Sequence, residues 1–286
     1  MHKTQIIILG IAQDAGYPHA GCRKDCCRNA WHDSSLQKFA ACVGIADPES
    51  GSYWLIDATP DIKFQMHSAE ERFPVCRLKG VFITHAHTGH YAGLINFGKE
   101  IMAADRMPVF VMPGMKKFLN ENYPWKQFVE MGYIELTDLV NDAELKLNER
   151  AAITPFKVPH RDEHSETVGF EIKGKNKNII YIPDIDEWDK WDRDIVDTVR
   201  NADELYLDGT FYNGSEIRNY HSKKIPHPLV TVSMEKFNSL SREEKARVNF
   251  IHLNHTNPLI RKDSMETEEV LSRGFRIAEE GRTTVI

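Results

Sequence analysis

The chain has 286 residues with a formal net charge of −6, and its apolar fraction of 41% excludes a disordered protein. No apolar run approaches the roughly 18 residues that a membrane span needs, and the mild negative charge gives no reason to expect general nucleic-acid binding. The 13 histidines and 5 cysteines make metal binding the first question.

Apolar runs and helical patterns divide the chain into two strand-rich halves. Runs of strand length lie at residues 5–11, 41–46, 53–56, 80–84, 109–112, 133–136, 153–158, 168–172, 178–182, 204–207 and 248–253. Helical patterns lie at residues 61–71, 90–104, 115–122, 188–201, 230–240 and 264–272. Two groups of strands, each followed by helices, predict an α/β protein with two sheets packed face to face and helices outside. We expect one domain over residues 1–286.

The N-terminus and the cysteines favour a cytoplasmic location. The apolar run at residues 6–12 is at the lower limit for a signal-peptide core, and Gln13 and Asp14 follow it without a small-residue cleavage site. We therefore expect this run to form a buried first strand. The cysteine count is odd, and three thiols crowd together at Cys22, Cys26 and Cys27, which is not typical of a disulfide framework.

Many of the predicted strands end at a histidine or an aspartate. These residues are Asp57, His85, His160, Asp184, Asp208 and His252. Because the carboxyl ends of strands meet at the edge where α/β folds place their sites, we expect these side chains to converge. Imidazole and carboxylate are ligands that suit Zn, Fe or Mn. The pattern therefore predicts a metal centre.

The spacing of His85, His87 and His90 is the strongest single signal. His85 and His87 are two residues apart, so in an extended segment they point to the same side. His90 begins a helical pattern and can reach a second metal from the helix end. A solvated histidine-rich turn is the alternative interpretation of these three residues.

These residues resemble a known signature. The segment ITHAHTGHYAGL is similar to the His-x-His-x-Asp-His motif of the metallo-β-lactamase superfamily, and LIDATPD, VPH, YIPD and IHLNH follow in that superfamily's order. The resemblance implies an αββα sandwich, the metallo-β-lactamase fold, with one or two active-site metals. The segments ILGIAQDAGYPHAGCRKDCC, YLDGTFYNG and FIHLNHTNPLIRKDSMETEEVLSRGFRIAEEG resemble the family of coenzyme PQQ synthesis protein B. A looser resemblance connects the chain to tRNase Z-like phosphodiesterases.

The resemblance implies a ligand for each metal position. The first metal would bind His85, His87 and His160, and the second would bind His90 and His252, with Asp184 as the bridge. We prefer His160 to His164 because it ends a strand pattern, and His252 to His255 because its place in IHLNH matches the superfamily ligand.

Two departures qualify this assignment. Gly89 stands where the superfamily usually supplies a carboxylate to the second metal. In the other direction, many PQQ synthesis proteins have lost the histidine pair that His85 and His87 preserve in this chain. The chain therefore looks more like a metal hydrolase than these relatives do.

A second, structural metal site is also implied. Some phosphodiesterase relatives hold zinc with three N-terminal cysteines and the histidine three residues beyond the last active-site ligand. In this chain the set would be Cys22, Cys26, Cys27 and His255, which is a closed tetrahedral combination for zinc. Free thiols in a loop are the alternative.

Three further residues are assigned supporting roles. His227 resembles the histidine that tRNase Z-like enzymes use near the leaving group, so it is a candidate general acid, although a surface turn between two prolines remains open. Asp208 would orient His227 or a metal ligand. Asp57 is more often a structural hydrogen-bonding residue than a ligand in this superfamily.

The leading functional hypothesis is an enzyme, a metallo-hydrolase in which a metal-activated hydroxide attacks a phosphodiester or ester-like bond. Its catalytic residues would be His227, Asp208 and Asp184, with one or two Zn in the active site, where Fe or Mn could replace them, and one structural Zn. The alternative is an iron-dependent oxygenase related to coenzyme PQQ synthesis protein B, acting on a tyrosine- or peptide-derived substrate. A non-enzymatic role with a vestigial centre is the third hypothesis. We expect a small-molecule substrate and no membrane partner, and the sequence leaves the oligomeric state open.

Overall fold

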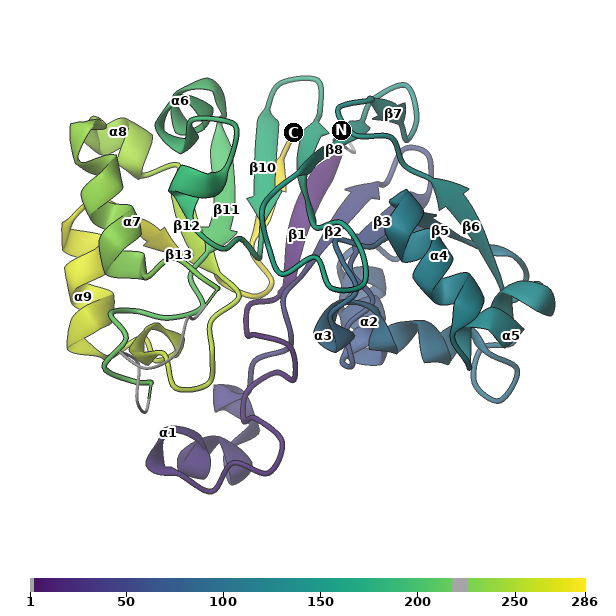
Figure 1. Cartoon of the computed structure of the whole chain (residues 1–286), viewed down its shortest axis with the longest axis horizontal. Coiled ribbons are helices and arrows are strands. Elements are labelled where there is room, and N and C mark those ends of the chain that lie inside the picture. The colour runs from purple at the N-terminus through teal and green to yellow at the C-terminus, as the bar shows by residue number, and fades with distance from the viewer. Residues whose placement is uncertain (1–2, 218–225) are drawn as a thin grey trace.

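Two seven-stranded sheets are the centre of the computed structural model, which describes residues 3–217 and 226–286 (Figure 1). The first sheet has the order β14-β1-β2-β3-β4-β5-β6, with bounds Thr283–Val285, Gln5–Gly10, Cys42–Asp47, Ser52–Ile56, Arg77–Phe82, Met107–Val111 and Ile134–Asp138. Strands β3 to β6 run parallel to one another, whereas the pairs β14–β1, β1–β2 and β2–β3 are antiparallel.

The second sheet has the order β13-β12-β11-β10-β9-β8-β7. Its bounds are Arg276–Ile277, Val248–Ile251, Glu204–Asp208, Asn178–Ile182, Val168–Lys173, Ala152–Lys157 and Leu145–Lys146. Strands β10 to β13 are parallel, and β7 to β10 are antiparallel. The parallel strands therefore deliver several carboxyl ends to one edge of each sheet.

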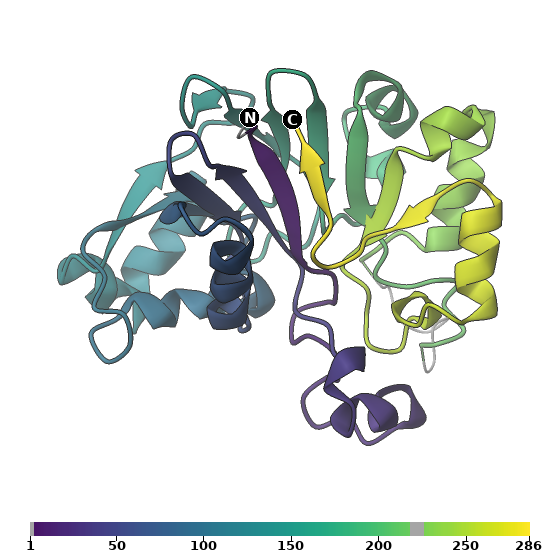
Figure 2. The same ribbon diagram turned by 180° about the vertical axis from the view of Figure 1, so that it is seen from behind.

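Helices cover the outer faces of both sheets (Figures 1 and 2). Those associated with the first sheet are α2 (Ile62–Arg72), α3 (Thr88–Tyr91), α4 (Pro113–Glu121) and α5 (Trp125–Glu130). Those associated with the second sheet are α6 (Ile195–Asn201), α7 (Val230–Lys236), α8 (Arg242–Lys245) and α9 (Met265–Ser272). This arrangement confirms the predicted αββα sandwich. None of the helices within the described ranges is long and apolar enough to span a membrane.

Strand β1 shows why the sheets pack in this way. Its side chains alternate between two cores, because Ile6 and Ile8 join the core between the sheets, whereas Ile7 and Leu9 join the core beneath the helices of the first sheet. A strand that is apolar on both faces is typical of a sheet covered on both sides. The predicted buried first strand is therefore present.

A segment between β1 and β2 projects from the sandwich. It carries α1 (Asp25–Arg28) and lies at the bottom of the view in Figure 1. The sequence patterns gave no helix there, and they also missed α5, α8 and the short strands β7, β13 and β14.

Two predicted helices are shorter than their patterns. The pattern at 188–201 becomes a 3-10 turn at Trp188–Lys190 followed by α6. The break arises because Asp194 accepts hydrogen bonds from the backbone N–H groups of Val196 and Asp197 and so begins the helix there. The pattern at 90–104 becomes α3 and a 3-10 helix at Ala92–Phe97.

Candidate metal centre

The polar residues that follow the strands converge between the two sheets. Asp57 follows β3, His85 and His87 follow β4, and His90 lies on α3. From the second sheet, the converging residues at or just beyond the ends of β8, β10, β11 and β12 are His160, Asp184, Asp208 and His252. The structure therefore brings together the side chains that the sequence assigned to the active site.

His85, His87 and His160 form one group of nitrogen donors. Their potential ligand atoms lie within 4.8 Å of one another. Nε2 of His85 is 2.8 Å from Nδ1 of His87, and the rings of His87 and His160 have centroids 5.0 Å apart. This geometry fits the first metal position that the sequence predicted.

His90 and His252 form a second group, and the carboxylate of Asp14 joins them. The potential ligand atoms of these three residues also lie within 4.8 Å of one another. Nε2 of His90 is 3.8 Å from Oδ1 of Asp14. The predicted second position therefore has its two histidines, together with an acidic residue that the sequence did not suggest.

Asp184 lies between the two groups. Its Oδ1 is 3.7 Å from Nε2 of His160, whereas its Oδ2 is 3.0 Å from Nε2 of His90 and 3.3 Å from Nε2 of His252. Its Oδ2 is also 3.9 Å from Nε2 of His85, so the carboxylate lies between the two histidine groups, which is the arrangement expected of a bridging carboxylate. The residue is only 2% exposed.

The Nδ1 atoms of three histidines lie within hydrogen-bond distance of neighbouring side chains. Nδ1 of His85 and the hydroxyl of Thr84 are 2.9 Å apart, Nδ1 of His90 lies 2.7 Å from Oδ2 of Asp57, and Nδ1 of His252 is 2.9 Å from the hydroxyl of Thr210. An Nδ1–H donor in each ring leaves the Nε2 lone pair free toward the centre. Asp57 therefore orients His90, in line with the structural role expected of it.

Unpaired polar atoms at the centre show that metal ions fit these residues. Nε2 of His90, His160 and His252 and Oδ2 of Asp184 are buried without a hydrogen-bond partner within the described residues. A buried polar group without a partner costs roughly 1–3 kcal/mol. Nitrogen and oxygen donors of this kind suit Zn, Fe or Mn, and a bound ion would satisfy all four atoms.

The protonation states of most of the proposed ligands are compatible with metal binding; burial opposes protonation of His90, but Asp57 and Asp184 override that effect and raise its pKa well above the ordinary value. Burial lowers the pKa of His87 to about 4 and, together with the neighbouring His90, places the pKa of His85 well below its ordinary value. Burial also lowers the pKa of His252. Burial opposes ionisation of Asp184, but His252 and His90 outweigh it and hold the pKa of that carboxyl well below its usual range. Neutral imidazole and ionised carboxylate are the forms that bind metals.

His227 is buried beside this centre, not on a surface turn. It is 8% exposed, and its Nδ1 lies 2.8 Å from Oδ2 of Asp208 and 3.6 Å from Oδ1 of Asp184. Burial opposes protonation of His227, but Asp208 overrides that effect and raises the pKa of the imidazole. Asp208 also accepts a hydrogen bond from the backbone N–H of Ile185, which fixes the carboxylate itself.

The choices between neighbouring histidines can be compared directly. His160 lies in the centre, whereas His164 is exposed and packs against Phe118 with ring centroids 5.7 Å apart. His252 is in the centre and His255 belongs to the cysteine group. His2 and His221 lie outside the described residues.

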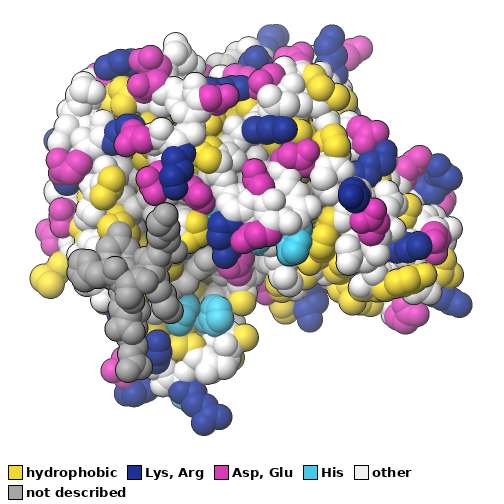
Figure 3. Space-filling view, viewed as in Figure 1, with side chains coloured by type: hydrophobic (Ala, Val, Ile, Leu, Met, Phe, Trp, Pro, Cys, Tyr) yellow, Lys and Arg dark blue, Asp and Glu magenta, His cyan; other side chains and the backbone are white. Residues whose placement is uncertain are grey.

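Among the described residues of the centre, His87 and Asp14 are the more exposed to solvent. The side chains of His85, His90, His160, Asp184 and His252 are at most 3% exposed, whereas those of His87 and Asp14 are 21% and 42% exposed. A substrate would therefore approach past His87 and Asp14. The space-filling view shows histidine reaching the surface in the middle of this face and again beside the projecting segment (Figure 3).

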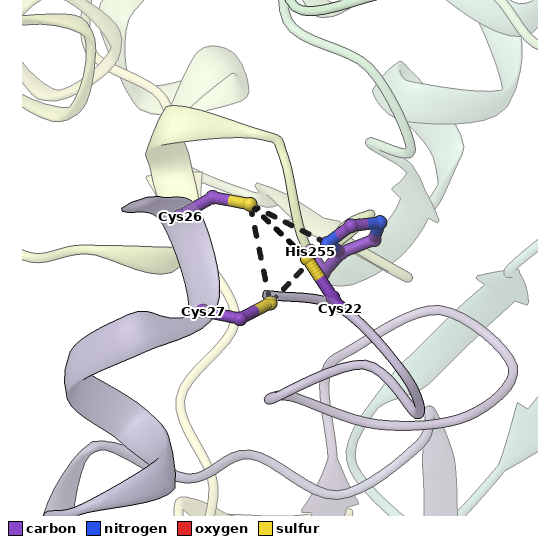
Figure 4. A group of neighbouring side chains, drawn as sticks. All are labelled: Cys22, Cys26, Cys27 and His255. Carbon is purple, nitrogen blue, oxygen red and sulfur yellow. Dashed lines mark hydrogen bonds between the residues drawn. The ribbon is translucent and has the colours of Figure 1, made fainter. Parts of the chain in front are cut away.

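The three clustered cysteines meet His255 as a second group of donors. Cys26 and Cys27 lie on α1, Cys22 lies just before it, and the four donor atoms point to a common centre (Figure 4). Sγ of Cys22 is 3.8 Å from Sγ of Cys26, and Nδ1 of His255 is 3.3 Å from Sγ of Cys27. Two sulfurs bound tetrahedrally at about 2.3 Å from zinc lie about 3.8 Å apart, so this geometry fits a zinc ion.

Electrostatics around these cysteines differ from one thiol to the next. Burial raises the pKa of Cys27 to about 12 and lowers that of His255 to about 4. Burial acts against ionisation of Cys22 too, but the backbone N–H of Lys24 and the neighbouring thiols lower its pKa. The ring of His19 packs on that of His255, with centroids 4.6 Å apart.

Asp14 is the residue of the centre that sequence reasoning missed. It follows β1 after the apolar run, just as Asp57 and Asp184 follow their strands. The same criterion of an acidic residue after a strand would have selected it. The sequence analysis used Asp14 only to argue against a signal peptide and gave it no place in the metal centre.

The fold, with its two groups of potential metal ligands, is that of a known superfamily. Residues 53–225, more than half of the chain, match the beta-lactamase superfamily domain, and the chain belongs to that family. The resemblance predicted from the sequence is confirmed.

Two sets of relatives extend the match over the whole chain. Coenzyme PQQ synthesis protein B of Methylorubrum extorquens is 25% identical over 308 residues, which cover 97% of this chain and 98% of that protein. The protein of the same name from Acinetobacter baumannii is 25% identical over 303 residues, covering 96% of this chain and 98% of that protein.

Solved structures show the same fold. The crystal structure of Zn(2+)-bound PqqB from Methylobacterium extorquens has a TM-score of 0.81 at 21% identity and covers 99% of this chain and 100% of its own. A diphosphatase from the PhnP family has a TM-score of 0.69 at 21% identity, with 99% of this chain and 96% of its own covered. The short form of human tRNase Z has a TM-score of 0.59 at 16% identity and covers 99% of both chains.

Proposed function

We propose that the chain is a metal-dependent hydrolase that acts on a phosphodiester or an ester-like bond of a small molecule. The observation that carries this proposal is the position of Asp184, whose carboxylate lies between the two histidine groups while Nδ1 of His227 lies 3.6 Å from its Oδ1. The histidine pair His85 and His87 also supports it, because a complete first group is what a hydrolytic centre needs.

The residues would divide the chemistry between them. His85, His87 and His160 would hold one ion, and His90, His252 and Asp184 would hold a second, with Asp184 shared. Bound ions of this kind supply a Lewis acid and an activated water near neutral pH. His227, oriented by Asp208, would deliver a proton to the leaving group. The buried histidines around Asp184 would keep bulk water away from the reacting bond.

Replacement of His87 tests this proposal. His87→Ala removes a donor on the solvent-accessible side of the centre, so turnover should fall by roughly a thousandfold or more, as the loss of several kcal/mol of transition-state stabilisation predicts. The measurement is kcat/KM on a panel of phosphodiesters and lactones, with circular dichroism to check the fold. His164→Ala is the matched control, because it removes an exposed histidine that packs on Phe118. Full activity of His87→Ala would show that the active site is elsewhere.

We further propose that Cys22, Cys26, Cys27 and His255 hold a structural zinc. The close distances among these donors support this proposal, and the set has no open position for a substrate. The PqqB structure from Methylobacterium extorquens is Zn(2+)-bound, and although that ion belongs to another protein, it is consistent with zinc as the metal in this chain.

An iron-dependent oxygenase is the second candidate function. It is favoured by the group of two histidines and one carboxylate at Asp14, His90 and His252, a set typical of non-haem iron oxygenases, and by the relatives named for PQQ synthesis. Elemental analysis of protein purified without added metal separates the candidates. Bound iron with substrate-dependent oxygen consumption would favour the oxygenase, whereas bound zinc with hydrolysis would favour the hydrolase.

A further inference from the structure

Gly89 leaves the space into which Asp14 projects. A Cβ atom at position 89 would lie 2.4 Å from both Cα and Oδ1 of Asp14, distances that no real side chain tolerates. Any residue larger than glycine at this position would therefore push the Asp14 segment away. The carboxylate of Asp14 can therefore occupy this place only because position 89 has no side chain.

The Asp14 carboxylate lies beside the two histidine nitrogens of the second metal position. Nε2 of His90 and Nε2 of His252 are buried, and Oδ2 of Asp184, the proposed bridge, lies 3.0 Å and 3.3 Å from them. Oδ1 of Asp14 is 3.8 Å from Nε2 of His90, a separation too long for a hydrogen bond. Ligands bound to one ion at about 2.0–2.2 Å lie about 3–4 Å apart, so an ion between these atoms explains the spacing.

Backbone hydrogen bonds to Leu253, the residue after His252, hold the Asp14 segment in this position. Ala12 forms a parallel bridge with Leu253, and the N–H of Gln13 donates to the carbonyl of Leu253 at 2.9 Å. The N–H of Leu253 in turn donates to the carbonyl of Ile11 at 2.8 Å. Asp14 and His252 are thus placed by one shared set of main-chain hydrogen bonds.

We propose that Asp14 is a ligand of the second metal position, which it completes together with His90, His252 and the bridging Asp184. The ion would be a divalent cation that accepts nitrogen and oxygen ligands. This inference rests on the proposed metal centre. It assigns to the projecting segment between β1 and β2 a direct contribution to that centre.

Metal stoichiometry after loading with Zn²⁺ alone tests the role of Asp14. Asp14→Gly removes the carboxylate and suits the positive φ of +40° at this position, so the variant should fold. We expect it to bind one Zn²⁺ fewer per chain than the unmodified protein after dialysis. Gly89→Ala should lose the same ion, because the added methyl group displaces Asp14. Asp105→Asn, which removes an exposed carboxylate before β5, should change nothing.

The outcomes separate this inference from the proposed function. If the unmodified protein binds two zinc ions beyond that of the cysteine group and Asp14→Gly binds the same two with unchanged affinity, Asp14 is not a ligand, although the hydrolase proposal stands. If the unmodified protein binds none beyond the cysteine group, both ideas are wrong. Substitution with Co²⁺ provides a second readout, since loss of the second ion should alter its visible absorption spectrum.

Discussion

Three residues of the metal centre have backbone conformations that residues with side chains rarely adopt. The φ angle is +40° at Asp14, +72° at Asp57 and +62° at His252. Each such residue costs roughly 1–3 kcal/mol unless its surroundings hold it in place, and such residues cluster at functional sites. Glycine or asparagine would adopt these φ angles at a lower cost in free energy. We therefore infer that the strained conformations are kept because they direct these side chains toward the centre.

At the same scale, His227 should matter most for substrates with poor leaving groups. His227→Ala should reduce kcat about 10²- to 10⁴-fold for an alkyl phosphodiester, because an alkoxide needs a proton as it departs. A p-nitrophenyl ester should lose far less, since its leaving group is stable as an anion. The measurement is the ratio of kcat values for the two substrates. Equal losses on both would contradict an acid role for this residue.

Asp208 should act through His227. Asp208→Asn removes the negative charge that lies 2.8 Å from Nδ1 of His227, while an amide of the same size remains. We expect the same dependence on the leaving group as in His227→Ala, but weaker, with metal content unchanged. A loss of metal would instead show that Asp208 supports the ligands.

Local pattern was sufficient to predict most of the residues at the centre. His85, His160, Asp184 and His252 each end or follow an apolar run, so period and position along the strand identified them. Asp14 also follows a strand, but the bridge that brings it beside His252 joins residues far apart in the chain, so local pattern does not show which residues it meets. The placement of His227 was likewise open, since a histidine between two prolines is equally compatible with a turn.

At the scale of elements, hydrogen bonds join the base of the segment between β1 and β2 to the sandwich, whereas its outer part, residues 18–37, bonds mainly within the segment. Tyr17 donates from its hydroxyl to the carbonyl of Cys26 at 2.6 Å, and Trp31 donates from Nε1 to the carbonyl of Cys22 at 2.8 Å. These bonds are internal to the segment. The cysteine group joins it to His255, which lies beyond β12, so this group fixes the segment to the body.

Loss of one cysteine should therefore release the segment. Cys27→Ser should lose the structural zinc and make residues 18–37 a preferred site of limited proteolysis, because their other hydrogen bonds stay within the segment. The measurements are zinc content and mass spectrometry of the fragments. Cys76→Ser is the matched control, as it alters a buried thiol outside the group and should keep its zinc. An intact segment in zinc-free Cys27→Ser would refute the anchoring role.

The elements themselves were predicted unevenly, for physical reasons. The long buried strands have strong apolar runs, and each lies within a few residues of its predicted range. Short strands such as β7 and β13 have two residues each, too few to show a period. The predicted helix at 188–201 begins too early because the side chain of Asp194 caps the helix that follows it, and hydrophobic periodicity does not detect caps.

On the scale of the whole molecule, the metal centre connects the two sheets. His85 and His87 follow β4 of the first sheet, whereas His160 and Asp184 follow strands of the second. The sheets also touch directly, as Phe82 and Phe170 pack edge to face with ring centroids 5.8 Å apart. Bound ions would add a polar connection to this apolar interface, at the edge where the parallel strands end.

Metal removal should therefore lower the stability of the entire fold. An ion present at a hundred times its dissociation constant stabilises the native state by about 2.7 kcal/mol, which corresponds to a Tm shift of roughly 5 °C for a chain of this size. Tm should fall by at least that much after chelation, as measured by calorimetry with elemental analysis of the same sample. The variant Cys27→Ser, which should lack only the structural zinc, separates the two sites: its Tm should still drop on chelation, because the residues of the histidine centre come from both sheets. An unchanged Tm in fully demetallated protein would mean that apolar packing alone holds the sheets together.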